Sequence, residues 1–153
     1  STYSRNISAN AMEKIIENVM CDYELADGTT LNHTNFEIKS MPYSSNANAE
    51  YDGMKNGRHK VLEKGFYFEY TVENIRSTIG DHEVYGHGIL GVNTKAEHFS
   101  VFKHQLKSAP SGITDKLKQN IYFNLYRYYS ASHGGNEPPR KYWDKYIKYG
   151  GER

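Results

Sequence analysis

Hydrophobic residues recur every three or four positions near the start of the chain and again through its second half. This spacing buries one face of an α-helix. Ser8 and Thr114 precede two such segments, where a hydroxyl group caps the first turn, and Thr94 to Glu97 has the capping-box pattern. The pattern predicts five helices, over residues 8–20, about 72–87, 94 to about 109, 114 to about 129, and 140–149.

A second pattern, the alternation of hydrophobic and polar residues, lies in the first half of the chain and predicts β-strands. Strands are expected over residues 21–25, 35–41, 60–63 and 66–70, and a surface loop over the polar residues 42–55. Lys64-Gly65 separates the last two strands, so these two are expected to form a hairpin.

The order of the elements predicts an α+β fold, with a small antiparallel sheet in the N-terminal half packed against a helical C-terminal half. We expect a single domain over residues 1–153, because this length suits one domain and no linker divides the chain. Only 37% of the residues are hydrophobic, but fourteen tyrosines supply rings that can fill a core.

Charge and composition exclude several classes of protein. The 19 basic and 18 acidic residues leave a net charge of +1, so no overall field attracts nucleic acid or an anionic membrane. This charge gives nucleic acid no support as a partner and does not exclude it. The sequence contains no apolar run of the about 20 residues that span a bilayer and no signal-peptide pattern. Cys21 is the only cysteine, which excludes an internal disulfide and a multi-thiolate zinc site. Because the chain begins at Ser1, we expect it to be an excised part of a longer protein.

Four of the seven histidines fall within residues 82–104. The most specific pattern is Asp81-His82-Glu83-Val84-Tyr85-Gly86-His87-Gly88, in which a His-Glu pair is followed by a second histidine on a predicted helix. In zinc-dependent peptidases two such imidazoles bind the metal and the carboxylate takes a proton from water. A solvated polar turn at a helix end is the alternative interpretation of the same residues.

The spacing of the two histidines departs from the usual motif, which places them four positions apart. His82 and His87 are five apart, which in a regular α-helix gives about 140° of rotation and keeps them from sharing one ion. A single-residue π-bulge, for which Gly86 has the backbone freedom, returns them to one face. Alternatively, the helix ends at Tyr85 and His87 reaches the ion from the following turn.

A catalytic zinc site needs a third protein ligand and an open position. The candidates nearest in sequence are His98, His104 and Glu97. His98 is favoured because it lies early in its predicted helix, off the hydrophobic stripe, and the short preceding loop can fold that helix back. Glu97 has a competing role in the capping box. Within the motif, Tyr85 is either a packing residue or a hydrogen-bond donor to an oxyanion.

The stretch from Ser77 to Ile89 resembles the active helix of zincin-like metallopeptidases, in particular the metallopeptidase toxin domains at the C-termini of large bacterial polymorphic toxins. The resemblance covers this stretch alone. It implies that His82 and His87 are metal ligands and that Glu83 is the general base. It also implies secretion or delivery from a bacterial cell as part of a larger protein, a protein or peptide substrate, and a cognate immunity protein as partner.

The sequence therefore favours a zinc-dependent hydrolase, a metallopeptidase acting as a delivered toxin, with Zn²⁺ held by His82, His87 and His98. One alternative is a metal-dependent nuclease toxin in which His82 is the base and Glu83 or another acidic group holds a divalent cation. The triplet Asp81-His82-Glu83 and the basic and aromatic segment Arg140 to Arg153 motivate that alternative. The other alternative is a non-enzymatic binding module whose histidines have no metal role.

Overall fold

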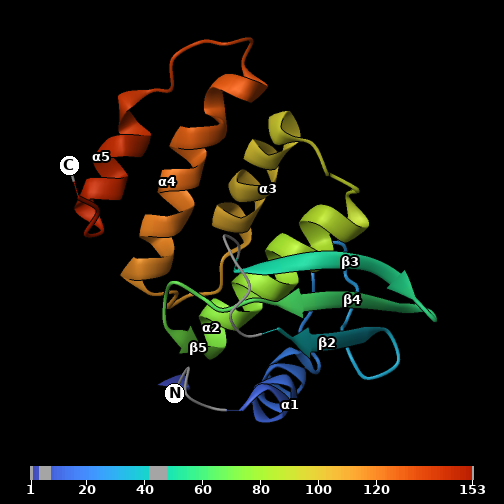
Figure 1. Ribbon diagram of the computed structural model, residues 1–153. Coiled ribbons are helices and arrows are strands. Elements are labelled where there is room, and N and C mark those ends of the chain that lie inside the picture. The colour runs from blue at the N-terminus through green and yellow to red at the C-terminus, as the bar shows by residue number, and fades with distance from the viewer. Residues whose placement is uncertain (1, 4–7, 42–47, 153) are drawn as a thin grey trace.

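The computed structural model describes residues 2–3, 8–41 and 48–152, and it has the predicted α+β class (Figure 1). A small sheet lies in the first half of the chain, and helices fill the second half. The elements in chain order are β1 (Thr2–Tyr3), α1 (Ala9–Met20), β2 (Phe36–Ser40), β3 (Ala49–Lys55), β4 (Arg58–Glu63), β5 (Tyr70–Thr71), α2 (Val72–Ile75), the π-helix η1 (Arg76–Ile89), α3 (Lys95–Ser108), α4 (Asp115–Ser132) and α5 (Arg140–Lys148).

The main sheet has three strands in the order β2-β4-β3. Strands β3 and β4 are antiparallel and are joined by Asn56-Gly57, which have φ angles of 55° and 76°. Such left-handed angles at both positions are what a two-residue hairpin turn requires. Strand β2 pairs with β4 in parallel, so the sheet is mixed, whereas an antiparallel sheet was expected. Strands β1 and β5 form a separate antiparallel pair.

Two of the predicted elements in the first half are wrong. The surface loop expected over residues 42–55 contains strand β3 from residue 49 onward, and residues 42–47 lie outside the described ranges. Strand β3 is polar because it forms the edge of the sheet, and of its seven residues only Ala49 is buried. Residues 21–25 form no extended strand: backbone hydrogen bonds join Asp22, Tyr23 and Leu25 to residues 29–31, with one isolated bridge between Glu24 and Thr30.

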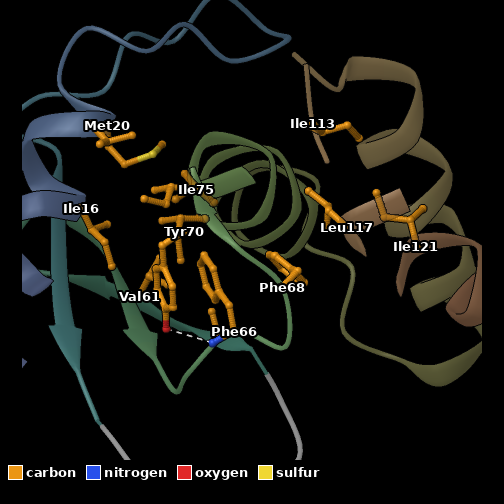
Figure 2. Close-up of a cluster of buried hydrophobic side chains, with 14 of the residues drawn as sticks. Ile16, Met20, Val61, Phe66, Phe68, Tyr70, Ile75, Ile113, Leu117 and Ile121 are labelled. Carbon is orange, nitrogen blue, oxygen red and sulfur yellow. Dashed lines mark hydrogen bonds between the residues drawn. The ribbon is translucent and has the colours of Figure 1, made fainter. Parts of the chain in front are cut away.

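Residues 66–70 also differ from the prediction, because they do not pair with β4 as the second strand of a hairpin. They turn inward, and their alternate rings Phe66, Phe68 and Tyr70 are buried. The rings of Phe66 and Tyr70 stack with centroids 4.4 Å apart, and the backbone N–H of Phe66 donates to the Tyr70 hydroxyl group (Figure 2). Figure 2 shows that these rings meet side chains from α1, β4 and α2, namely Ile16, Met20, Val61 and Ile75.

The helices begin where the sequence predicts. Ser8, Thr94 and Thr114 each accept a hydrogen bond from the backbone N–H three residues further on. Helices α3, α4 and α5 lie side by side with α4 in the middle (Figure 1). Leu117, Ile121 and Leu125 of α4 are buried, as their spacing predicts. None of the helices in the described ranges combines the length and the apolar character that crossing a bilayer requires.

Gly86 allows α3 to pack closely against η1. A Cβ atom at Gly86 would lie 2.5 Å from Cγ1 of Val101 on α3, which is too close for any side chain. We therefore expect Gly86→Ala to lower the free energy of unfolding by about 1–3 kcal/mol, as overpacking does, and urea denaturation measures this. Val101→Ala removes the clashing methyl groups, so the double variant should lose less than the sum of the two single losses. Additive losses would contradict this explanation.

Candidate metal centre

His82 and His87 lie on a π-helix. One α-helical turn, α2, leads into η1, which runs from Arg76 to Ile89 and has Leu90 as its C-cap residue. Backbone hydrogen bonds in a π-helix join residues five apart, so side chains five apart lie on the same face. The single-residue bulge expected from the sequence is therefore wrong in extent, because the π-helix has 14 residues. The alternative in which the helix ends at Tyr85 is wrong as well.

His98 comes from the first turn of α3, which packs against η1. The reversal between the two helices is short: Leu90 N–H donates to the Tyr85 carbonyl group, and Gly91 takes a φ of 68°. The ring of Phe102, one turn after His98, contacts both His82 and His98, with centroid distances of 4.6 and 4.7 Å. Packing thus fixes the imidazole from α3 beside the imidazoles from η1.

The three imidazoles converge through their Nε2 atoms. Nε2 of His82 lies 3.3 Å from Nε2 of His87 and 3.2 Å from Nε2 of His98. Two nitrogens that are each about 2.0–2.1 Å from a tetrahedral zinc ion are about 3.3–3.4 Å apart. His82, His87 and His98 therefore lie close enough together to bind one metal ion.

The opposite ring nitrogens of His82 and His87 already have partners. Nδ1 of His87 donates to the Val92 carbonyl oxygen, and Nδ1 of His82 donates to Oε1 of Gln105 at 2.8 Å. A neutral imidazole carries one N–H, so both Nε2 atoms are unprotonated acceptors. Two lone pairs that face each other at 3.3 Å repel, and a cation between them removes the repulsion. This donor set fits a metal ion, and its outer partners are of the kind that orient ligating histidines.

Gln105 is the outer partner that a substitution can test most directly, because it also donates to Ser77 Oγ and is 2% exposed. We expect Gln105→Ala to weaken zinc binding about 10- to 100-fold, since loss of an orienting partner has that effect. A competition titration with a zinc-binding dye measures this. Gln105→Glu keeps the acceptor for His82 Nδ1 and should bind zinc at least as tightly as the alanine variant. Equal zinc affinity in the wild type and Gln105→Ala would contradict the orienting role.

Burial lowers the pKa of all three imidazoles. For His82 the pKa falls well below its usual value, through burial first and then through His87 and His98. Burial lowers the pKa of His98 to about 4, with further contributions from His87 and Arg127. For His87, burial outweighs the hydrogen bond to Val92, which acts in the opposite direction on its pKa. Near pH 7 the rings are therefore neutral, which is the form that binds a metal.

Glu83 places a buried carboxyl group beside the imidazoles. Its Oε2 atom lies 3.8 Å from Nε2 of His82, and the residue is 5% exposed. Burial raises the pKa of Glu83, and a hydrogen bond from the Tyr51 backbone acts in the opposite direction. The carbonyl group of Asn48 accepts from the N–H of Lys64, directly after β4. Because the backbone groups of an antiparallel strand alternate in direction, the Tyr51 N–H then points away from β4 and toward Glu83. The edge strand β3 thus holds Glu83 in place.

The other candidate residues lie elsewhere. His104 packs its ring on Tyr85 with centroids 4.3 Å apart, and Glu97 is exposed and bonded to Thr94 in the predicted capping box. The structure therefore brings His98 to the cluster and leaves His104 and Glu97 outside it. Tyr85 packs against His104 and is not one of the residues that line the cleft. Asp81 also faces away from the cleft, toward the hydroxyl group of Tyr23 at 2.8 Å.

The histidine cluster and Glu83 open onto a cleft of about 850 Å³. Strand β3 forms one wall and α4 forms the other, with Asn120, Phe123, Asn124, Arg127 and Tyr128 facing the cleft. The sequence did not identify Gln105, Tyr51 or Arg127 as parts of this site. Helical spacing could have identified Gln105, because it lies seven positions after His98 and therefore on the same face of the predicted helix. Tyr51 and Arg127 come from other elements and carry no local signal.

Comparison of the chain with known protein families, with curated proteins and with solved structures gives no match. The arrangement of the side chains therefore carries the functional argument.

Proposed function

We propose that this chain is a zinc-dependent peptidase in which His82, His87 and His98 hold the metal and Glu83 is the general base. One observation carries the proposal: three Nε2 atoms converge at separations of 3.2 and 3.3 Å beside a buried carboxyl group. Titratable groups that converge in a cleft are the usual mark of a catalytic site.

The donor set favours zinc. Three neutral imidazoles with a fourth position left open form one of the ligand sets of catalytic zinc, whereas magnesium and calcium prefer oxygen ligands. When bound, zinc supplies a Lewis acid that acidifies water and polarises a carbonyl group. The cleft gives water and substrate access to the side of the cluster that the protein leaves open.

Glu83 is placed to move protons during hydrolysis. In its ionised form the carboxylate accepts a proton from the attacking water and returns it to the leaving amine. Burial strengthens its affinity for that proton, and the hydrogen bond from the Tyr51 N–H fixes the orientation of the carboxyl group. His82 and Glu83 are adjacent in sequence, so one turn of η1 sets the distance between the metal-binding nitrogen and the base.

The backbone groups at the outer edge of β3 favour a peptide as the substrate. By alternation, the N–H and C=O groups of Ala49 and the C=O group of Tyr51 point away from β4 at the cleft, whereas the Tyr51 N–H is already bonded to Glu83. An open strand edge accepts an extended peptide as an additional strand. Such a peptide would run past the histidine cluster with its backbone fixed, which suits cleavage of a peptide bond.

The nuclease alternative has less support. Of the described residues that line the cleft, Arg127 is the one Lys or Arg, and none belongs to the basic helix α5. Nucleic-acid binding draws its affinity from several phosphate contacts. Delivery of the chain as a bacterial toxin, and an immunity protein as partner, rest on the resemblance of residues 77–89 alone.

One experiment separates the candidate functions. Zinc-loaded protein is incubated with a proteome-derived peptide library, plasmid DNA and tRNA, each with and without a chelator. We expect peptide cleavage that the chelator stops and added zinc restores, and intact nucleic acids. Chelator-sensitive cleavage of plasmid or tRNA would favour the nuclease instead. Absence of bound zinc and of any cleavage would favour the binding module.

A further inference from the structure

We propose that Arg127 on α4 binds a carboxylate of the substrate, so that the cleft selects acidic peptides. This inference rests on the proposed peptidase function and names its substrate class. The carboxylate belongs either to an aspartate or glutamate side chain or to the C-terminus of the peptide. Both sources present the same group to the guanidinium, and the experiment below distinguishes them.

The position of Arg127 follows from a chain of contacts that begins at the metal centre. The ring of Tyr128 lies against the ring of His98, with centroids 4.7 Å apart. The guanidinium of Arg127 lies 4.9 Å from the centroid of the Tyr128 ring, and its Nη2 atom donates to the Tyr128 hydroxyl oxygen at 2.9 Å. Tyr128 thus orients the guanidinium on the cleft wall beside a candidate metal ligand.

The guanidinium keeps most of its hydrogen-bonding capacity. It has five N–H donors in a planar fork that matches a carboxylate, and one of them is used on Tyr128. Within the described ranges, no carboxylate lies within ion-pair distance of Arg127, whereas six other such pairs are present. Arg127 is thus available for an acidic ligand.

The two carboxyl groups that line the same cleft are both engaged. Glu50 pairs with Lys64 at 3.3 Å, and Glu83 is buried beside the histidines. A substrate carboxylate at the α4 wall therefore meets one unpaired positive charge. A lysine side chain at that position meets repulsion.

The side of α4 that faces the cleft carries polar side chains beside aromatic rings. Asn120, Asn124 and Arg127 are spaced four and three positions apart, which places them along one side of the helix. Phe123 and Tyr128 also line the cleft, whereas Ile121 and Leu125 are buried in the core. The three polar side chains therefore face the cleft and not the core.

Hydroxamate ligands test the inference without a need for turnover. Hydroxamic acids chelate zinc, so a dipeptide that carries a succinyl hydroxamate on its N-terminal amine is anchored at the histidine cluster and keeps its own C-terminus. Four dipeptides are compared: glutamate-bearing with an amidated end, glutamine-bearing with a free C-terminal carboxylate, glutamine-bearing with an amidated end, and lysine-bearing with an amidated end. Calorimetry measures their dissociation constants on the zinc-loaded wild type, Arg127→Glu, Arg127→Lys and Lys116→Glu. Lys116 is exposed on α4 outside the cleft, so Lys116→Glu makes the same change of charge.

We expect one of the carboxylate-bearing hydroxamates to bind the wild type about 10- to 100-fold more tightly than the neutral one, as hydrogen bonds to charged groups do. The preferred ligand identifies the source of the carboxylate.

Arg127→Glu should abolish this preference and favour the lysine-bearing ligand. Arg127→Lys should keep part of the preference, and Lys116→Glu should leave it unchanged. Equal binding of acidic and neutral hydroxamates, or equal weakening of all four by Arg127→Glu, overturns the inference while leaving the metal site intact. If no hydroxamate binds, the metal site itself is wrong, and the inference is overturned with it.

Discussion

Glu83→Gln is expected to abolish peptide cleavage while the protein keeps its zinc. The amide has nearly the shape of the carboxyl group and fits beside His82, where Oε2 lies 3.8 Å from Nε2. It cannot accept a proton at neutral pH, so general-base catalysis is lost. Such catalysis contributes about 10²- to 10⁴-fold to the rate, and we expect kcat to fall by that factor.

The test measures kcat on a peptide identified from the library, together with zinc content by elemental analysis. Glu97→Gln is the matched control, because Glu97 is exposed at the start of α3 and outside the cleft. It should leave both kcat and zinc content unchanged. Undiminished kcat in Glu83→Gln would reject the mechanism, and loss of zinc in that variant would show that Glu83 has a ligand role.

His82→Ala is expected to remove stoichiometric zinc binding, and with it the stabilisation that zinc confers on the folded chain. Nε2 of His82 lies 3.3 Å from Nε2 of His87 and 3.2 Å from Nε2 of His98. Loss of a residue that only orients a ligating histidine weakens metal binding up to about 100-fold. Loss of the His82 ligand itself should weaken zinc binding by more than this. At a zinc concentration of about 100 times Kd, the wild type gains about 2.7 kcal/mol of stability, which this variant lacks.

Thermal unfolding with zinc and with chelator measures this stabilisation, and a dye competition gives the affinity. His104→Ala is the matched control because its ring packs on Tyr85 outside the cluster, so it should keep the zinc response of the wild type. His98→Ala should behave like His82→Ala. A zinc-dependent rise in Tm that survives both His82→Ala and His98→Ala would disprove the three-histidine site.

The sequence was informative where structure depends on local spacing. Ser8, Thr94 and Thr114 cap helices because each hydroxyl bonds to its own first turn. The buried stripe of α4 followed from residues three and four positions apart. These interactions lie within one element, so a pattern in the sequence determines them.

The strands were harder to predict because pairing partners lie far apart in the chain. Strand β3 is a polar edge strand, so it lacks the hydrophobic alternation of a buried strand. Asn56-Gly57, which joins it to β4, was the available signal. The rings of residues 66–70 alternate like a strand but serve to fill the core between α1 and the sheet.

The candidate site was predictable in its residue types and only partly in its geometry. His82, Glu83 and His87 stand in one motif, and His98 follows on the next predicted helix. The sequence predicted a single-residue π-bulge and not the 14 residues of the π-helix, and the close packing of Gly86 against Val101 is likewise a contact between elements that lie apart in the chain. The contributions of Tyr51 and Arg127 depend on how β3 and α4 are placed around the cleft.

Crystals of the zinc-loaded protein, measured on both sides of the zinc absorption edge, test the central claim most directly. We predict one anomalous peak, about 2.0–2.1 Å from an imidazole nitrogen of each of His82, His87 and His98. A peak at another position, or fully loaded crystals with no peak at these three rings, would contradict it.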